Sequence, residues 1–268
     1  MSSRIAVAAT APFGADVLQR LSGSYEISCL LTRPDARAGR GRTLAPPPAK
    51  EVAHALGIPV LQPERLESGL DLDASTVVVV AYGRLIPVPL LAERLWLNVH
   101  PSLLPRWRGA APVERALMAG DEKTGVTIIE LVEDLDAGPI AAQEVLAIEP
   151  EDDAGGLYAK AAPLAAALLD AVISHPDVPF RPQPAAGVTY ADKITPDDRA
   201  LDLSSPSDDL VNRVRALSPH IGARAELHGR PVTVWRARVG EDGGFEPLEV
   251  QPDGGRRMEY EAWLRGLR

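Results

Sequence analysis

The chain has 268 residues, which at about 150 residues per domain suggests one large domain or two modest ones. Its composition, 46% hydrophobic and 24% charged, is ordinary for a globular protein and excludes a mostly disordered chain. The net charge of −9 excludes a protein that coats nucleic acid over its whole surface and leaves room only for a local basic face.

Hydrophobic runs alternate with helical spacing over the first two thirds of the chain. The run Thr76–Ala81 is continuous and β-branched, which is typical of a strand buried on both faces. This alternation predicts a parallel sheet with helices on both sides. We expect strands at 4–9, 25–31, 58–60, 76–81, 96–100 and 125–131, a loop over 33–48, and helices at 15–21, 50–56 and 154–173, the last interrupted by Pro163.

The C-terminal third has a different pattern. A Pro-rich and polar stretch over 175–206 reads as a linker. It precedes a short amphipathic helix and three short strand-like runs between Gly-rich turns, which predict a small β domain. The elements are expected at 208–217, 222–227, 231–239 and 245–250. We therefore divide the chain into a domain over 1–180, a linker over 181–206 and a second domain over 207–268.

Membrane and redox features are scarce in the sequence. We find no signal peptide and no apolar run near the ~20 residues that span a bilayer. The single cysteine, Cys29, excludes an internal disulfide and fits a reducing compartment. We expect a cytoplasmic monomer with no membrane partner.

Asn98 and His100 are the first candidates for chemistry. They stand two residues apart on a predicted strand, so both side chains point to the same face. The strand ends at Pro101, and the carboxyl end of a parallel strand is where open α/β sheets bind ligands. An isolated Asn and His pair is more often part of a core, but the adjoining loop with two prolines and a glycine favours a site.

Asp136 is the second candidate. It follows the predicted strand 125–131 and precedes Gly138. It reads either as part of a solvated acidic turn or as a carboxylate that orients an imidazole. A metal site is not expected, because no second His stands at ligand spacing.

The loop Arg37–Arg42 is cationic and rich in glycine, so it could grip phosphate or simply be solvated. Basic residues also gather near the C-terminus, where ten arginines follow Asp208. Their concentration suggests an anionic partner. The turn after the first strand lacks a G-x-G-x-x-G pattern, so a nicotinamide cofactor has no support.

The string Asn98-Val-His-Pro-Ser-Leu-Leu-Pro105, followed by Arg-Trp-Arg-Gly-Ala-Ala-Pro112, resembles the signature of the folate-dependent formyltransferases. The cationic loop and the strings Thr189–Ile194, Val250–Pro252 and Trp263–Gly266 resemble the branch that acts on methionyl-tRNA. Val80–Gly83 with Ile86-Pro87 resembles the strand and loop of the family's folate pocket.

The resemblance implies a Rossmann-like, mostly parallel catalytic domain followed by a small OB-like β-barrel. It implies formyl transfer from 10-formyltetrahydrofolate to the α-amine of initiator methionyl-tRNA for translation initiation, with no metal. Asn98, His100 and Asp136 fall on the family's catalytic positions. Ser102, Leu103, Leu104 and Pro105 fall on its folate-contacting positions. Arg40 and Arg42 fall in the loop that contacts tRNA.

The loop before the catalytic carboxylate departs from the family pattern Gly-Leu-Asp-Thr-Gly. Here it reads Asp134-Leu-Asp136-Ala-Gly138. Three alternatives stay open from the sequence: a formyltransferase acting on a sugar nucleotide or another small amine, a non-catalytic homologue that binds folate or RNA, and a hydrolase of formyl-folate.

Overall fold

The computed structural model describes residues 4–38, 43–175 and 177–267. The chain forms two compact units, and each is made of several stretches of sequence. The first comprises Met1–Arg108, Gly125–Val145 and Ala159–Thr189, and the second comprises Gly109–Thr124, Leu146–Tyr158 and Tyr190–Arg268.

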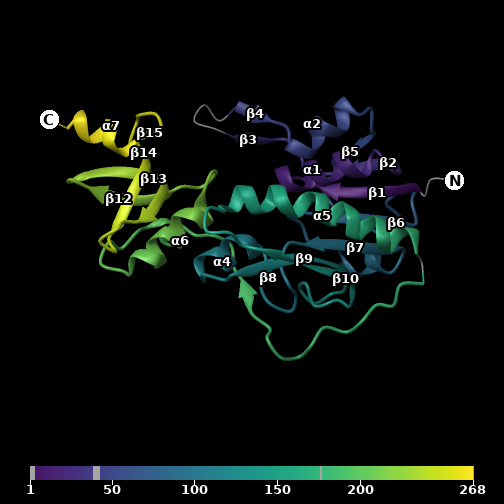
Figure 1. Ribbon diagram of the computed structural model, residues 1–268. Helices are drawn as coiled ribbons and strands as arrows, with labels where there is room; N and C mark the ends of the chain where they lie inside the picture. The colour runs from purple at the N-terminus through teal and green to yellow at the C-terminus, as the bar shows by residue number, and fades with distance from the viewer. Residues whose placement is uncertain (1–3, 39–42, 176, 268) are drawn as a thin grey trace. The chain divides into compact units, whose positions relative to one another are not determined.

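The first unit is built on a seven-stranded sheet in the order β10-β9-β7-β6-β1-β2-β5 (Figure 1). Strands β1, β2, β5, β6 and β7 pair in parallel, and β9 pairs antiparallel with β7. This mostly parallel arrangement confirms the predicted fold class. The strands are β1 (Arg4–Ala9), β2 (Glu26–Leu31), β5 (Val60–Leu61), β6 (Thr76–Val80), β7 (Leu95–His100), β9 (Lys123–Glu130) and β10 (Ile140–Ala147).

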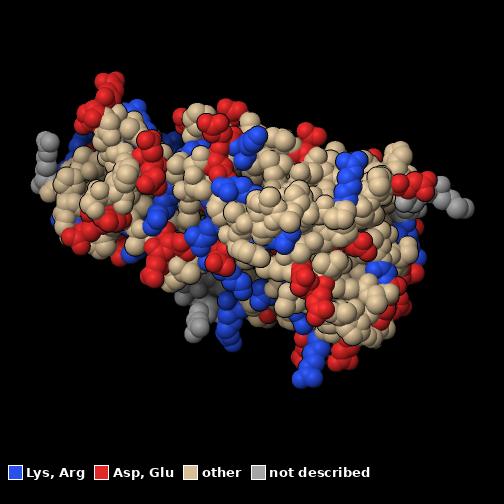
Figure 2. Space-filling view, turned by 90° about the horizontal axis from the view of Figure 1, so that it is seen from below, with Lys and Arg blue, Asp and Glu red and all other residues tan. Residues whose placement is uncertain are grey.

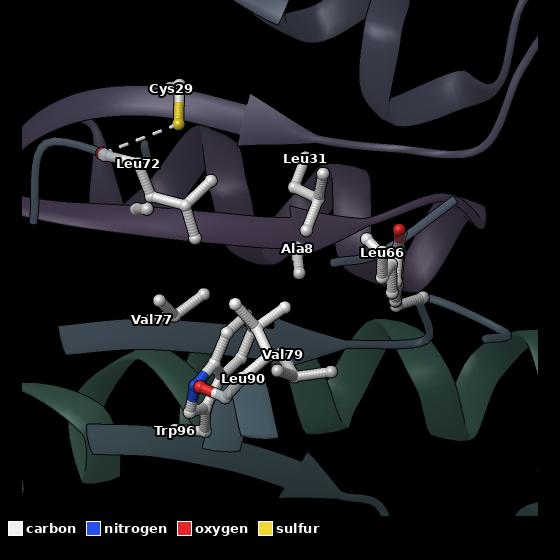
Figure 3. Packing of buried hydrophobic residues seen from close by; sticks show 11 residues of the cluster. Ala8, Cys29, Leu31, Leu66, Leu72, Val77, Val79, Leu90 and Trp96 are labelled. Carbon is white, nitrogen blue, oxygen red and sulfur yellow. Dashed lines mark hydrogen bonds between the residues drawn. The ribbon is translucent and has the colours of Figure 1, made fainter. Parts of the chain in front are cut away.

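Strand β6 lies near the middle of the sheet and is buried on both faces, as its β-branched sequence predicts. Val77, Val78, Val79 and Val80 are all buried, and each buried valine contributes roughly 1.5–3 kcal/mol. Alternate residues of neighbouring strands build one core cluster, in which the labelled side chains of Figure 3 pack together. Its buried members are Ala6, Ala8, Cys29, Leu31, Leu66, Leu72, Val77, Val79, Tyr82, Leu90 and Trp96.

The lone cysteine belongs to this packing. Cys29 is buried, and its Sγ lies 3.6 Å from the backbone oxygen of Leu72, the contact dashed in Figure 3. Burial raises the pKa of its thiol, which disfavours the reactive thiolate. Cys29 therefore acts as a small core residue.

Helices accompany the sheet of the first unit. α1 (Pro12–Leu21) contacts β1 and β6, and α2 (Pro48–Ala55) contacts α1, β2 and β5. Both helices carry proline in their first turn, where the missing N–H would have no helical partner. The short α3 (Val88–Leu91) precedes β7.

Helix α5 (Ala154–Ser174) begins in the second unit and ends in the first. By length and composition it is the one helix in the described residues that could cross a membrane. The core helix of a soluble protein passes the same test, and α5 buries Leu157, Ala161, Ala165 and Leu169. The expected absence of a membrane partner stays a prediction.

The second unit holds a four-stranded antiparallel sheet in the order β12-β13-β14-β15 (Figure 1, green to yellow). Its core joins residues of the sheet with Leu210, Val214 and Leu217 of α6 and with Trp263 of α7. The elements are α4 (Pro112–Met118), α6 (Ser207–Leu217), β12 (Ala223–Leu227), β13 (Arg230–Val239), β14 (Phe245–Pro252), β15 (Met258–Glu259) and α7 (Tyr260–Arg265).

Several local expectations were wrong. The predicted loop 33–48 contains the paired strands β3 (Ala36–Ala38) and β4 (Thr43–Ala45). Pro163 does not interrupt α5, and no helix was expected at α4 or strand at β10. Strand β10 was missed because it is an edge strand with a largely exposed, weakly alternating sequence. The remaining short elements are β8 (Arg108–Gly109), β11 (Tyr190–Ala191) and the 3₁₀ helix η1 (Asp197–Arg199).

Candidate active site

Asn98 and His100 lie at the carboxyl end of β7, in the first unit. Val79 of β6 lies beside Asn98, and Thr127 of β9 lies opposite His100. The His100 residue is only 3% exposed. The strand register thus holds an amide and an imidazole on one face, two residues apart.

Asp136 comes from the loop between β9 and β10 and meets both side chains. Its Oδ1 accepts a hydrogen bond from Asn98 Nδ2 at 3.3 Å, and its Oδ2 lies 3.6 Å from His100 Nδ1. The residue is 9% exposed and has a φ of +46°. The structure therefore brings together the three side chains that the sequence singled out.

The other ring nitrogen of His100 faces the backbone of Trp107. The distance from Nε2 to the Trp107 oxygen is 2.7 Å. A carbonyl oxygen only accepts hydrogen bonds, so this contact places a hydrogen on Nε2. Nδ1, the remaining ring nitrogen, faces the Asp136 carboxylate.

The loop after β7 holds the four residues assigned to folate by resemblance. Ser102 is fully buried, and its Oγ donates to the Arg106 oxygen at 2.7 Å. Leu104 is also buried, at 3% exposed, and it precedes Pro105, whereas Leu103 is half-buried. The Ser102 hydroxyl thus bonds within its own loop. A contact of this loop with the folate stays a prediction.

Two residues that the sequence analysis did not single out, Thr127 and Gln143, hold this loop in place. Thr127 Oγ1 donates to the Ser102 oxygen at 2.6 Å and accepts from the Leu104 N–H. Gln143 of β10 donates from Nε2 to the Leu104 oxygen at 3.0 Å and to Thr127 Oγ1 at 2.8 Å. Polar residues on the two strands β9 and β10 were the available signal, but β10 was not recognised as a strand.

The residues assigned to tRNA, Arg40 and Arg42, lie outside the described residues. In the second unit, four of the nine C-terminal arginines that the structure describes face carboxylates: Arg224, Arg236, Arg238 and Arg265. Such pairing weakens the field that these arginines offer to phosphate. On the face in Figure 2, Lys and Arg are likewise interspersed with Asp and Glu.

Metal ligands do not cluster within residues 4–38, 43–175 and 177–267. No group of three or more His, Cys, Asp or Glu side chains there is arranged to hold an ion.

Comparisons with known proteins identify the family of the chain. The formyl transferase family model matches residues 3–173, and the model of its C-terminal domain matches residues 193–247. The "Methionyl-tRNA formyltransferase" of Halorhodospira halophila is 40% identical over 100% of this chain and 97% of its own length.

Two solved structures share the fold. Methionyl-tRNA formyltransferase from Clostridium thermocellum aligns with a TM-score of 0.66 at 13% identity, over 96% of this chain and 99% of its own. HypX from Aquifex aeolicus, in complex with tetrahydrofolic acid, aligns with a TM-score of 0.67 at 17% identity, over 98% of this chain and 46% of its own.

The sheet, its polar carboxyl edge and these matches define a folate-dependent formyltransferase fold, and the chain belongs to the formyl transferase family. Within that family, it belongs with the methionyl-tRNA formyltransferases.

Proposed function

We propose that this chain transfers the formyl group of 10-formyltetrahydrofolate to the α-amine of initiator methionyl-tRNA, in translation initiation. The observation that carries the proposal is the convergence of Asn98, His100 and Asp136 at one sheet edge in a chain of this family. A cytoplasmic location and the absence of a membrane partner belong to the same proposal.

The reaction joins the amine nitrogen to the formyl carbon and breaks the bond from that carbon to N10 of the folate. Negative charge builds on the formyl oxygen during the attack. The Asn98 amide has two N–H groups, and one is directed to Asp136, so the other can donate to this oxygen. One such donor is typically worth about 3 kcal/mol of barrier.

The proton released by the amine must reach N10 of the departing folate. Asp136 and Nδ1 of His100 face each other at 3.6 Å, and together they can hold one proton. The pair takes it from the attacking nitrogen and returns it to N10. Such acid–base assistance is typically worth about 10²–10⁴ in rate.

The loop Ser102–Pro105 is proposed to hold the folate donor. Its backbone is held by Thr127 and Gln143 and follows directly from His100. A folate bound along this loop would lie next to the three polar side chains, which supports the assignment.

The function is tested by supplying 10-formyltetrahydrofolate with initiator methionyl-tRNA, elongator methionyl-tRNA or a nucleotide-linked amino sugar in parallel. Formylation confined to the initiator tRNA supports the proposal, and formylation of the sugar alone contradicts it.

Arg40 and Arg42 are proposed to contact the tRNA phosphates. We expect Arg40→Ala with Arg42→Ala to raise the KM for tRNA about ten-fold or more and to leave the KM for the folate unchanged, because lost phosphate contacts weaken only the nucleic acid. Steady-state kinetics at two salt concentrations measures this. An equal loss for both substrates, or none, would reject the assignment.

A further inference from the structure

The two groups that face the His100 ring share an unusual backbone conformation. Trp107, whose carbonyl faces Nε2, has a φ of +65°, and Asp136, whose carboxylate faces Nδ1, has a φ of +46°. Residues other than glycine seldom adopt positive φ, and such strain persists only where the surroundings impose it. Something must therefore hold each of them.

Trp107 is held by Thr189. The Trp107 N–H donates to Thr189 Oγ1 at 2.9 Å, and the next N–H, of Arg108, donates to the Thr189 backbone oxygen at 2.9 Å. These two bonds fix the peptide units on either side of the Trp107 α-carbon. The direction of the Trp107 carbonyl towards His100 is thereby set.

Asp136 is held by Gln183. The Gln183 amide donates from Nε2 to the backbone oxygen of Asp136 at 2.7 Å and to the backbone oxygen of Gly138 at 2.8 Å. Its Oε1 accepts from Arg108, at 3.1 Å from Nε and 2.7 Å from Nη2. Both the nitrogen and the oxygen of the Gln183 amide therefore have partners. Arg108 links the two residues, because its side chain bonds to Gln183 and its N–H bonds to the Thr189 oxygen.

Both holding residues come from one short segment of the first unit, which we call the brace, residues 183–189. Residues 184–187 within it are exposed, whereas Gln183 and Thr189 are half-buried. The segment thus touches the molecule chiefly where it contacts the partners of His100. We propose that the brace is a positioning element of the active site, in which Thr189 and Gln183 aim the Trp107 carbonyl and the Asp136 carboxylate at the two ring nitrogens of His100.

This inference rests on the proposed function for its kinetic consequence. A ring held from both sides keeps its tautomer and its orientation through the proton transfers. Catalysis is sensitive to such placement, since a shift of about 1 Å can cost about 10²-fold in rate. The side chains of Thr189 and Gln183 bond to the backbone of other residues and to Arg108. The Thr189 N–H also donates to the Pro105 oxygen at 3.4 Å, a backbone contact that a change of the Thr189 side chain leaves in place. Loss of the two side-chain groups should therefore lower kcat and spare substrate binding.

The test uses variants that keep the side-chain shape. We expect Thr189→Val and Gln183→Met each to lower kcat at least about ten-fold, with the KM for the folate and for the tRNA changed less than about two-fold. Thr189→Ser restores the hydroxyl acceptor and should recover kcat to within about three-fold of the parent. Thr124→Val is the matched control, because Thr124 is buried and its hydroxyl has no partner among the described residues; its kcat should not change.

A spectroscopic readout separates the brace from the proposed function. The chain has five histidines, and the ring ¹⁵N signals of His100 are those lost in His100→Ala. We expect Thr189→Val to shift the Nε2 signal, Gln183→Met to shift the Nδ1 signal, and Thr189→Ser to restore the parent spectrum. If the parent forms no formyl-methionyl-tRNA, the proposed function fails, and these shifts alone decide the inference.

Three outcomes would overturn the brace. The first is unchanged kcat and unchanged His100 signals in both Thr189→Val and Gln183→Met. The second is a rise in KM at constant kcat, which would make the segment a substrate contact. The third is equal loss in Thr189→Ser and Thr189→Val, which would make packing, and not the hydroxyl, responsible. Melting temperatures show whether each variant is folded, and Gln183→Met decides the matter should Thr189→Val fail to fold.

Discussion

Polar side chains are buried at one end of the central sheet and exposed at the other. At the carboxyl end of β7, His100 and Asp136 are 3% and 9% exposed and share their hydrogen-bonding groups with Asn98 and the Trp107 backbone. At the amino ends of β1 and β6, a cavity of about 900 Å³ is lined by Arg4, Asp73 and other charged residues. There Arg4 and Asp73, with side chains 46% and 65% exposed, form an ion pair at 2.7 Å.

A hollow therefore lies at the end of the sheet where the charged side chains are exposed. Burying a polar group costs free energy unless its partners are supplied, so a buried amide, imidazole and carboxylate that face one another require a dedicated frame. Exposed charges need no such frame, because water solvates them. Burial with mutual orientation identifies the site, and four substitutions with one control test this difference.

The largest effect is expected for His100→Ala. Removal of the imidazole leaves Asp136 without the ring that faces its Oδ2, and it abolishes the proton route described above. We expect kcat to fall at least about 10²-fold, and the free energy of unfolding to fall by about 1–3 kcal/mol because the Trp107 oxygen and the buried Asp136 carboxylate each lose a partner. Steady-state formylation and calorimetry measure the two effects. Activity within a few-fold of the parent would remove His100 from the mechanism.

Gly138→Ala tests the frame and not the chemistry. An added Cβ would lie 1.8 Å from the Glu130 backbone oxygen, so the loop that carries Asp136 must move. We expect a loss of about 1–3 kcal/mol in the free energy of unfolding and at least about a ten-fold loss of kcat, since a displacement of about 1 Å can cost about 10²-fold in rate.

Gly23→Ala is the matched control for this loop. The nearest atom to its added Cβ is the Arg20 oxygen at 3.5 Å, an ordinary contact, and we expect neither stability nor activity to change. Full activity in Gly138→Ala would show that the loop tolerates displacement and that Asp136 needs no fixed position.

How much of this contrast the sequence could predict depends on the kind of signal. Strand periodicity placed Asn98 and His100 on one face, and the β-branched run at Thr76 predicted the buried strand β6, because both effects act between near neighbours in sequence. Asp136 was a candidate from its place after the strand at 125–131, its catalytic role was assigned by resemblance, and its carboxylate lies beside both residues.

The contacts of the brace with the partners of His100 could not be predicted from the sequence. Thr189 and Gln183 stand in a Pro-rich stretch that reads as a linker, and their partners are 82 and 47 residues away in sequence. Trp107 and Asp136 have positive φ although neither is glycine, so no glycine marks these two positions in the sequence. Only the folded chain shows that these residues meet.

Arg115→Gln tests an ion pair of the second unit whose burial is intermediate between that of His100 and that of Arg4. Arg115 donates to both oxygens of Asp198, at 2.6 and 2.9 Å, and the two side chains are 20% and 19% exposed. The bond to Arg115 holds the pKa of Asp198 well below its usual range. We expect a loss of about 1–2 kcal/mol in unfolding free energy at neutral pH.

The sign of the pH dependence follows from that lowered pKa. A carboxylate with a depressed pKa stabilises the fold above its ordinary pKa of about 4, and this contribution is lost as the pH falls further. The difference in unfolding free energy between parent and Arg115→Gln should therefore shrink below about pH 4. Urea unfolding at pH 7 and at pH 3 measures it, and a difference independent of pH would assign the loss to packing.

The smallest effect is expected for Arg4→Gln at the amino end of β1. Its two partners, Glu26 and Asp73, are 61% and 65% exposed, and exposed ion pairs contribute less than about 1 kcal/mol because water and salt screen them. Formylation should be unchanged, since the residue lies at the end of the strands away from His100. The measurement is urea unfolding at low and high salt together with kcat and KM. A large loss of kcat would place chemistry or a required ligand in the cavity at that end, and the distinction drawn between the two ends would then be wrong.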